Sequence, residues 1–443
     1  MSDKISAVKR GVWGSKFAFV LAAAGSAVGL GNIWKFPYIT GVNGGGAFVL
    51  VYLLSVVLVG LPILMAEILL GKSAHRDPVG TFKVLSNGSK GWMLVGWLGV
   101  IAGFVILSFY SVVAGWAMNY LFKSIIHPFT GLDPKSVSEM FSHLAADPKT
   151  EIIWHFVFMF LTVIIVIGGV KSGLEKWSKI LMPLLFLILL FMVGYGMTTT
   201  GFSKGLEFLF KPDFSKLTPK SILEALGHAF FTLSLGMGAM ITYGSYLKNE
   251  DDIVGPAIWI AVLDTVIALL AGIAIFSIVF SFNLKPGAGP GLVFQTLPVI
   301  FAKIKFGMVL SSLFFLLLTF AALTSAISLL EVVVAYFVDE MNVNRKIATP
   351  VIGLIIFFLG VPSAIWDNFF GAMDSLSTNF LLPTGGFFIA IFAGYRLKEE
   401  IKKINFSKYG NWLYIGWNFT IRYLSPILVL IILLNSLGII KVI

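Results

Sequence analysis

A glycine-rich run interrupts the first long apolar segment of the chain. Gly25, Gly29 and Gly31 fall in a stretch, roughly residues 13–38, that otherwise has the length and composition of a membrane-spanning helix. Glycine costs a helix about 1 kcal/mol relative to alanine, and irregular backbone at membrane depth is tolerated only inside the protein or beside a cavity. A second interruption, residues 234–238, lies in another apolar segment half a chain later. Two interrupted helices in corresponding halves indicate the binding site of an inverted-repeat secondary transporter.

Composition supports a membrane protein. The chain is 58% hydrophobic and 12% charged, whereas a soluble domain carries about 25% charged residues. It has no cysteine, which excludes disulfides, thiolate metal sites and cysteine nucleophiles. The net charge of +10 would suggest nucleic-acid binding in a soluble protein. Here the basic residues lie in short loops, so we expect a lipid bilayer and no nucleic acid as partner.

The hydropathy pattern predicts an all-α integral membrane protein with eleven spans. Their approximate centres are residues 27, 58, 108, 160, 189, 236, 268, 322, 354, 382 and 431. Lysine and arginine favour the loops that face the cytoplasm if the N-terminus lies inside; we therefore expect a cytoplasmic N-terminus and an external C-terminus in the plasma membrane, with no cleaved signal peptide. One transporter domain, residues 1–443, would contain inverted five-helix repeats at 13–200 and 221–396 and an additional helix at 409–443.

Two further segments carry turn-forming residues. Residues 285–291 combine lysine, proline and glycine before an apolar stretch, which predicts an irregular, re-entrant external cap. Gly173 and Pro183 bracket the cytoplasmic start of the fifth span. This spacing either allows that helix end to unwind or is simply a loop glycine and a helix-kinking proline; the two interpretations stay open.

Three motifs resemble the neurotransmitter:sodium symporters. Residues 25–38 with 43–48 are similar to the first span and following turn of that family, residues 230–238 to its sixth span, and residues 321–325 to its eighth. The match runs nearly the whole chain in the same order, and the eleven-span length resembles the shorter bacterial amino-acid members. The resemblance implies two broken spans, 1 and 6, and a sodium-coupled symporter that moves a hydrophobic or aromatic L-amino acid into the cell by alternating access.

Simple electrostatics agrees with an amino-acid substrate. A half-helix beginning near Leu30 offers free N–H groups to a carboxylate, and carbonyl groups at the breaks, such as those of Ala27 and Phe231, can bind an ammonium group. The resemblance implies a largely apolar substrate pocket formed by Ser26, Ala27, Leu30, Gly31, Ile106, Tyr110, Phe231, Thr232, Ser234, Met237, Ser325 and Leu329. Met237 replaces an aromatic residue common in the family. As a flexible thioether it can admit aromatic substrates, or it can be a core-packing residue.

The family resemblance also implies two sodium ions as cofactors. The first would be bound by Ala27, Asn32, Thr232 and Asp264, together with the substrate carboxylate. The second would be bound by Gly25, Val28, Ala321, Thr324 and Ser325. Taken alone, Thr324 and Ser325 also fit a pair of hydroxyls bonded back to their own helix.

Charged residues at the membrane edges resemble the family's gates. Lys35 and Asp374 correspond to the external pair, where the family usually has arginine; lysine cannot form the two-bond fork with a carboxylate, so we expect a looser contact. The cytoplasmic gate corresponds to Arg10, Asp339, Trp13 and Tyr246. Glu67 corresponds to an acid that supports the broken sixth span.

One departure from the animal-type pattern concerns chloride. The neighbourhood that holds chloride in those relatives corresponds to Tyr52, His228, Thr232, Asp264 and Ala268. Asp264 stands where asparagine is common, and Ala268 supplies no hydroxyl. A carboxylate at position 264 would repel chloride, which predicts chloride independence. Asp264, with His228, could also carry a proton on the return step, giving proton antiport.

Other functions fit the sequence less well. Its five histidines are scattered without metal-ligand spacing and no phosphate-binding glycine–lysine loop is present, so we expect no enzyme. A channel also uses carbonyl rings, but two gates around one site argue against it. A proton-coupled transporter of the same fold would normally carry a base where Thr324 and Ser325 lie. A substrate-sensing role stays open, and the sequence predicts no oligomeric state.

Overall fold

The computed structural model describes residues 11–129, 131–284 and 291–440, which form helices and no strand. The first half comprises α1 (Lys16–Ala27), α2 (Phe36–Val42), α3 (Gly46–Ser55), α4 (Leu61–Ala74), α5 (Pro78–Leu85), α6 (Lys90–Ile126), α7 (Pro134–Ala145), α8 (Pro148–Ile167), α9 (Lys176–Met197) and α10 (Phe202–Phe210). The second half comprises α11 (Pro219–Thr232), α12 (Ala239–Gly244), α13 (Val254–Ser281), α14 (Leu297–Lys303), α15 (Gly307–Asp339), α16 (Arg345–Ile365), α17 (Asp367–Ser375), α18 (Leu382–Ile391), α19 (Glu399–Phe406), α20 (Asn411–Phe419) and α21 (Ser425–Ser436).

Several of these helices join through short π-helical turns into longer rods. Among the described residues, nine rods are long and apolar enough to cross a membrane, and α1 with the segment Gly31–Val42 makes a tenth, bent by 51°. The sixth predicted span is the broken pair α11 and α12. Each of these helices is too short to be counted as a membrane-crossing rod. All-helical membrane architecture is therefore confirmed, while the count of eleven spans stays a prediction. Residues 411–436 form one continuous rod, so the last predicted span begins close to residue 409.

Both predicted helix breaks are present. After α1, Val28 is extended (φ −72°, ψ 100°). A Cβ added at Gly29 would lie 2.5 Å from the Ser325 Oγ, so a larger residue there would require Ser325 to move. Between α11 and α12, Ser234, Gly236 and Gly238 all adopt positive φ angles, which glycine tolerates without strain. The glycine clusters therefore mark the breaks because the backbone there is either left-handed or in close contact with a neighbour.

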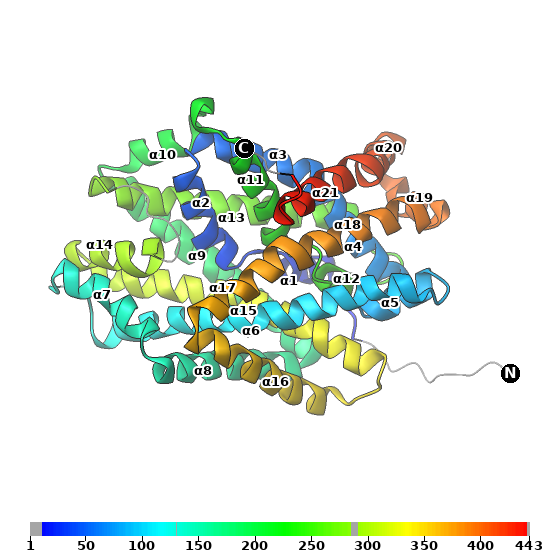
Figure 1. Cartoon of the computed structure of the whole chain (residues 1–443), viewed down its shortest axis with the longest axis horizontal. Helices are drawn as coiled ribbons and strands as arrows, with labels where there is room; N and C mark the ends of the chain where they lie inside the picture. The colour runs from blue at the N-terminus through cyan, green and yellow to red at the C-terminus, as the bar shows by residue number, and fades with distance from the viewer. Residues whose placement is uncertain (1–10, 130, 285–290, 441–443) are drawn as a thin grey trace.

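The long helices run along one axis of the molecule, with short helices at the two ends (Figure 1). Helices α7 and α14 lie at one end, which we call the outer end, and α5 and α19 lie at the other, the inner end. The names follow the orientation that the loop charges predict. Helices α6 and α15 pack along each other through the centre, and 23 residues of α15 are buried.

Of the two segments with turn-forming residues, the first lies mostly outside the described residues and the second is helical. Residues 285–290 lie outside the described residues, so the predicted cap is seen only from Gly291 onward, where a π-helical turn (Leu292–Thr296) leads into α14. The start of the fifth span is helical: a π-helical turn (Val170–Glu175) continues into α9, which contains Pro183. In this conformation the helix end between Gly173 and Pro183 is not unwound.

Candidate functional site

A small cavity lies where the two helix breaks face α6 and α15. Its volume is about 20 Å³, enough for roughly one water molecule. Its lining residues are Ser26, Ala27, Gly29, Leu30, Gly31, Ile106, Tyr110, Phe231, Ser234, Met237, Ser325, Ser328 and Leu329. The structure thus brings together every residue of the predicted substrate pocket except Thr232, and adds Gly29 and Ser328.

Three serine hydroxyls make one side of this cavity polar. The Ser26 hydroxyl donates to the Ser328 Oγ (2.7 Å), which in turn donates to the Ser325 carbonyl (2.8 Å). The Ser234 hydroxyl donates to the Ser26 carbonyl (2.8 Å). Sequence reasoning missed Ser328, although its position three residues after Ser325 places both on one face of α15. The predicted apolar pocket therefore has a hydroxyl-lined wall.

A larger cavity lies on the outer side of the first. It has a volume of about 150 Å³ and shares Leu30, Gly31, Tyr110 and Phe231 with the smaller one. The Leu30 N–H donates to the Tyr110 hydroxyl oxygen (3.2 Å). The first break therefore presents a backbone donor between the two cavities, where a ligand carboxylate can replace or share that hydrogen bond.

The predicted first sodium site is organised around Asp264. This fully buried carboxylate accepts hydrogen bonds from the Asn32 side-chain amide (2.7 Å) and the Thr232 hydroxyl (2.9 Å). Thr232 thus faces Asp264 rather than the substrate cavity. The Thr232 hydroxyl of α11 and the Asp264 carboxylate of α13 supply oxygen atoms here, the ligand type that a hard cation such as sodium prefers. Asn32 presents its amide nitrogen to Asp264, while its side-chain oxygen accepts from the Gly29 N–H (3.1 Å).

The predicted second sodium site joins α15 to the first break. The Thr324 and Ser325 hydroxyl oxygens each lie 3.4 Å from the Val28 carbonyl oxygen, long for O–H···O hydrogen bonds. Thr324 also donates to the Ala321 carbonyl (3.0 Å), and a Cβ at Gly25 would touch the Thr324 side chain at 3.3 Å. Thr324 is therefore bonded back to its own helix, whereas the Ser325 hydroxyl donates to the Ser26 carbonyl (3.1 Å). Both hydroxyls also face the Val28 carbonyl of the break, where oxygen ligands suit a cation.

The anion-site equivalents also cluster at Asp264. Tyr52 donates to its second carboxylate oxygen (3.3 Å), and the His228 ring lies 5.4 Å from that of Tyr52 and 5.9 Å from that of Phe36. Neither His228 ring nitrogen has a hydrogen-bond partner within the described residues. Ala268 is fully buried and offers no hydroxyl. Asp264 is therefore the acidic side chain around which these predicted residues gather.

The outer gate residues lie around the same cavities without a direct ion pair. Lys35 and Asp374 both line the 150 Å³ cavity and a second outer cavity of about 400 Å³. The Lys35 ammonium lies 4.7 Å from the centre of the Phe231 ring, whereas Asp374 accepts from the Thr378 hydroxyl (3.2 Å). Both residues belong to the described part of the chain, and no contact within 4.0 Å joins their charged groups. This looser arrangement agrees with lysine in place of arginine.

The inner end is closed by direct hydrogen bonds. Trp13 is 3% exposed; its indole donates to the Tyr243 carbonyl (2.9 Å) and its backbone N–H to the Tyr246 carbonyl (3.2 Å). Asp339 accepts from the Asp77 backbone N–H (3.0 Å). Arg10 lies outside the described residues, so the predicted Arg10–Asp339 pair stays a prediction.

A buried ion pair near Tyr246 was missed by sequence reasoning. The Arg345 guanidinium forms two hydrogen bonds with the Glu331 carboxylate (2.5 and 2.8 Å), and the Tyr246 hydroxyl donates to the same carboxylate. The Glu331 side chain is fully buried. The sequence did contain a signal, because Glu331 is a lone acid inside the long apolar segment of α15, where an ionisable residue requires a partner.

Glu67 supports the second break. Its carboxylate accepts a hydrogen bond from the Gly236 backbone N–H (2.7 Å) and is completely buried. This is the contact expected from the resemblance, and it satisfies a donor that the irregular backbone leaves without a helical partner.

Two broken helices that line a buried cavity at the centre of a bundle of membrane-length rods are the features of a secondary transporter. Comparisons with known proteins agree. The model of the sodium:neurotransmitter symporter family matches residues 10–133 and 135–442; the chain belongs to this family.

Individual relatives extend the comparison. The chain is 39% identical to the uncharacterized sodium-dependent transporter YhdH of Bacillus subtilis, over 97% of this chain and 98% of that protein. It is 35% identical to an uncharacterized sodium-dependent transporter of Haemophilus influenzae, with 97% and 98% covered. It is also similar to the solved structure of MhsT in complex with L-phenylalanine, with 44% identity, a TM-score of 0.90, and 96% of this chain and 100% of that chain covered.

Proposed function

We propose that this protein is a sodium-coupled symporter for hydrophobic and aromatic L-amino acids that works by alternating access. The observation that carries the proposal is the position of the small cavity. Ser325 of the Thr324–Ser325 cluster lines it, as do Gly31 and Phe231, the chain neighbours of Asn32 and Thr232 in the Asp264 cluster. Both breaks contribute to its wall. A ligand carboxylate near Leu30 would lie at the end of a half-helix that carries partial positive charge.

We further propose that two sodium ions bind together with the substrate. The first would be bound by Ala27, Asn32, Thr232 and Asp264, and the second by Gly25, Val28, Ala321, Thr324 and Ser325. A bound cation places positive charge beside the substrate carboxylate, and each would therefore stabilise the other.

The pocket chemistry supports the substrate class. Met237, Leu329 and Ile106 offer an apolar surface, and no charged side chain lines the small cavity. Burying an unpaired charge there would cost several kcal/mol, so lysine and glutamate are expected to be rejected. The complex of MhsT, a structural relative, with L-phenylalanine supports an aromatic side chain, and the flexible Met237 can adapt to one.

An uptake experiment tests this function. Purified protein in proteoliposomes should accumulate radiolabelled L-phenylalanine when sodium is outside and not when choline replaces it. Unlabelled tryptophan, leucine and phenylalanine should compete, while lysine, glutamate and glycine should not. The proposal would be refuted if a proton gradient without sodium drove uptake equally well, or if an acidic amino acid were the strongest competitor for phenylalanine uptake.

We further propose that transport is independent of chloride and is coupled to the export of a proton. If the Asp264 carboxylate supplies the negative charge that chloride brings in chloride-dependent relatives, uptake in sodium gluconate should equal uptake in sodium chloride. Asp264→Asn combined with Ala268→Ser should make uptake depend on chloride, because it removes the charge and adds a hydroxyl. Wild-type uptake that stops in gluconate would contradict the charge argument. Proton antiport predicts that an internal pH below the external pH accelerates uptake.

A further inference from the structure

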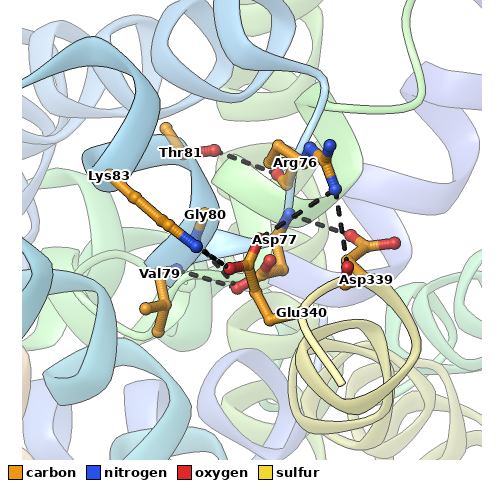
Figure 2. Close-up of polar contacts among 8 residues, drawn as sticks. All are labelled: Arg76, Asp77, Val79, Gly80, Thr81, Lys83, Asp339 and Glu340. Carbon is orange, nitrogen blue, oxygen red and sulfur yellow. Dashed lines mark hydrogen bonds and ion pairs between the residues drawn. The ribbon is translucent and has the colours of Figure 1, made fainter. Parts of the chain in front are cut away.

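Two carboxylates end the central helix α15 at the inner end of the molecule. Asp339 is its last residue and Glu340 follows it. Negative charge at a helix C-terminus opposes the helix dipole, so these residues do not serve the stability of α15 by themselves. Their partners come from the loop that joins α4 to α6 (Figure 2).

The loop binds both acids through backbone and side chains. The Asp77 N–H donates to the Asp339 carboxylate (3.0 Å). The Arg76 guanidinium donates to the Asp339 carbonyl (3.4 Å) and lies 4.0 Å from the Glu340 carboxylate. The Lys83 ammonium lies 2.8 Å from the other Glu340 oxygen, and the pKa of Lys83 is raised by this hydrogen bond and by the charge of Glu340. We call Arg76, Asp77, Lys83, Asp339 and Glu340 the inner clasp (Figure 2).

Local structure holds the clasp in one geometry. The fully buried Asp77 accepts from the backbone N–H groups of Val79 (2.9 Å) and Gly80 (3.2 Å), which caps α5. A Cβ at Gly80 would lie 2.7 Å from the Glu340 carboxylate, so a larger residue there would displace that carboxylate from its present position. The Glu340 side chain is only 15% exposed, against 52% for Lys83. These contacts are more specific than those of a chance surface pair.

The same loop also contacts the end of the broken sixth span. The His75 ring nitrogens lie 3.2 Å from the Ser245 carbonyl oxygen and 2.8 Å from the Asn249 side-chain oxygen. Ser245 precedes Tyr246, which lines the 620 Å³ cavity at the inner end together with Asp339. Three consecutive residues, 75–77, therefore bridge the inner ends of the sixth span and α15.

We propose that the inner clasp keeps the cytoplasmic side of the pathway closed, with Glu340 as the positioning residue that holds the α4–α5 loop and Asp339 in register. The inference rests on the proposed alternating access. His75 is bonded to the sixth span and Asp77 to α15, so moving these two elements apart would stretch the loop between them. An inward-open state must therefore break either the His75 contacts or the Asp77 contact. Exposed ion pairs contribute little to stability, and the role of the clasp is a bias between conformations rather than folding.

A single-cysteine reporter tests the clasp, because the chain contains no cysteine. Ser245→Cys places a thiol at a residue that is 2% exposed in the closed inner end. In inside-out vesicles without sodium, Glu340→Gln and Lys83→Met should each raise the rate at which a membrane-impermeant maleimide labels this thiol, by roughly threefold, the scale of a partly exposed ion pair. The double variant should label no faster than either single variant, because the two act through one contact.

Controls separate the clasp from the transport proposal. Lys90→Gln removes another exposed lysine at the start of α6 and should leave labelling unchanged. The effect of sodium on the Ser245→Cys protein alone tests sodium-coupled gating, whereas the difference between variants without sodium tests the clasp. Unchanged labelling in Glu340→Gln, or additive effects in the double variant, would overturn the inference. Each variant should keep the far-ultraviolet circular dichroism signal and the melting temperature in detergent of the Ser245→Cys protein. If partial unfolding, seen as a fall in the signal or in the melting temperature, explains the faster labelling, the inference is also contradicted.

Discussion

The two ends of the molecule are closed in different ways. At the inner end, Trp13 hydrogen bonds to two carbonyl groups of the sixth span, Glu331 pairs with Arg345, and the inner clasp ties the loop after α4 to α15. At the outer end, Lys35 and Asp374 line cavities of about 150 and 400 Å³ and no direct ion pair joins them in the described part of the chain. The inner end also has a cavity, of about 620 Å³, so the two ends differ in their bonds and not in empty volume. The inner gate residues are joined by specific bonds, whereas no direct bond joins the outer pair among the described residues. Under the proposed alternating access, this asymmetry predicts that the outer gate is the weaker barrier.

The largest effect is expected at the buried ion pair of the inner end. Glu331→Ala leaves Arg345 without its carboxylate and should lower the free energy of unfolding by about 3 kcal/mol, at the lower end of the range for broken buried pairs. A fall of several degrees in the melting temperature in detergent would measure it. Glu331→Ala with Arg345→Ala should recover part of the loss.

An exposed pair provides the matched control for that experiment. Lys211 and Glu207 are 2.8 Å apart with side chains 74% and 61% exposed, so Glu207→Ala should cost less than about 0.5 kcal/mol. If the Glu331 and Glu207 variants melt at the same temperature, the inner end is not held by its buried charges.

The next effect concerns the outer gate. Asp374→Asn should slow uptake about tenfold, equivalent to about 1.4 kcal/mol of lost gate stabilisation, while sodium-dependent binding of phenylalanine stays nearly unchanged because Asp374 does not line the small cavity. Uptake and binding assays on the same preparation make the comparison. Lys35→Arg should preserve uptake and Lys35→Ala should not; equal inactivity of both would remove Lys35 from the gate.

A smaller effect is expected from one hydrogen bond at the inner end. Trp13→Phe removes the indole donor to the Tyr243 carbonyl and keeps a ring beside Phe19 and Tyr243. Losing a hydrogen bond worth about 1 kcal/mol should raise the labelling of Ser245→Cys about fivefold. If Trp13→Phe does not change the labelling rate of the Ser245→Cys protein, the indole hydrogen bond does not contribute to closure and packing alone closes this end.

The breaks and the site around them could be predicted because their signals are local or shared with the family. Glycine clusters in apolar segments identified both breaks, and the family motifs identified all but two of the residues that line the small cavity. Glu331 was visible as a lone acid in an apolar helix, but its partner Arg345 lies beyond the end of that helix, and only the turn after α15 brings them together.

Other contacts had no sequence signal. The Asp77–Asp339 contact uses a backbone N–H, and every residue except proline has one. Ser328 was overlooked because an apolar pocket was expected, and a serine in a helix usually bonds to its own backbone. The distance between Lys35 and Asp374 depends on the conformation of the outer end, which the residues themselves do not specify. The inverted repeats at 13–200 and 221–396 likewise stay a prediction.

The most direct test of the account measures the coupling of sodium and substrate. Scintillation-proximity binding of L-phenylalanine should be near background in choline chloride and saturable in sodium chloride. Because linkage is reciprocal, phenylalanine should strengthen the apparent affinity for sodium by the same factor by which sodium strengthens that for phenylalanine. Equal affinity for phenylalanine with and without sodium would contradict the claim that the two breaks bind both together.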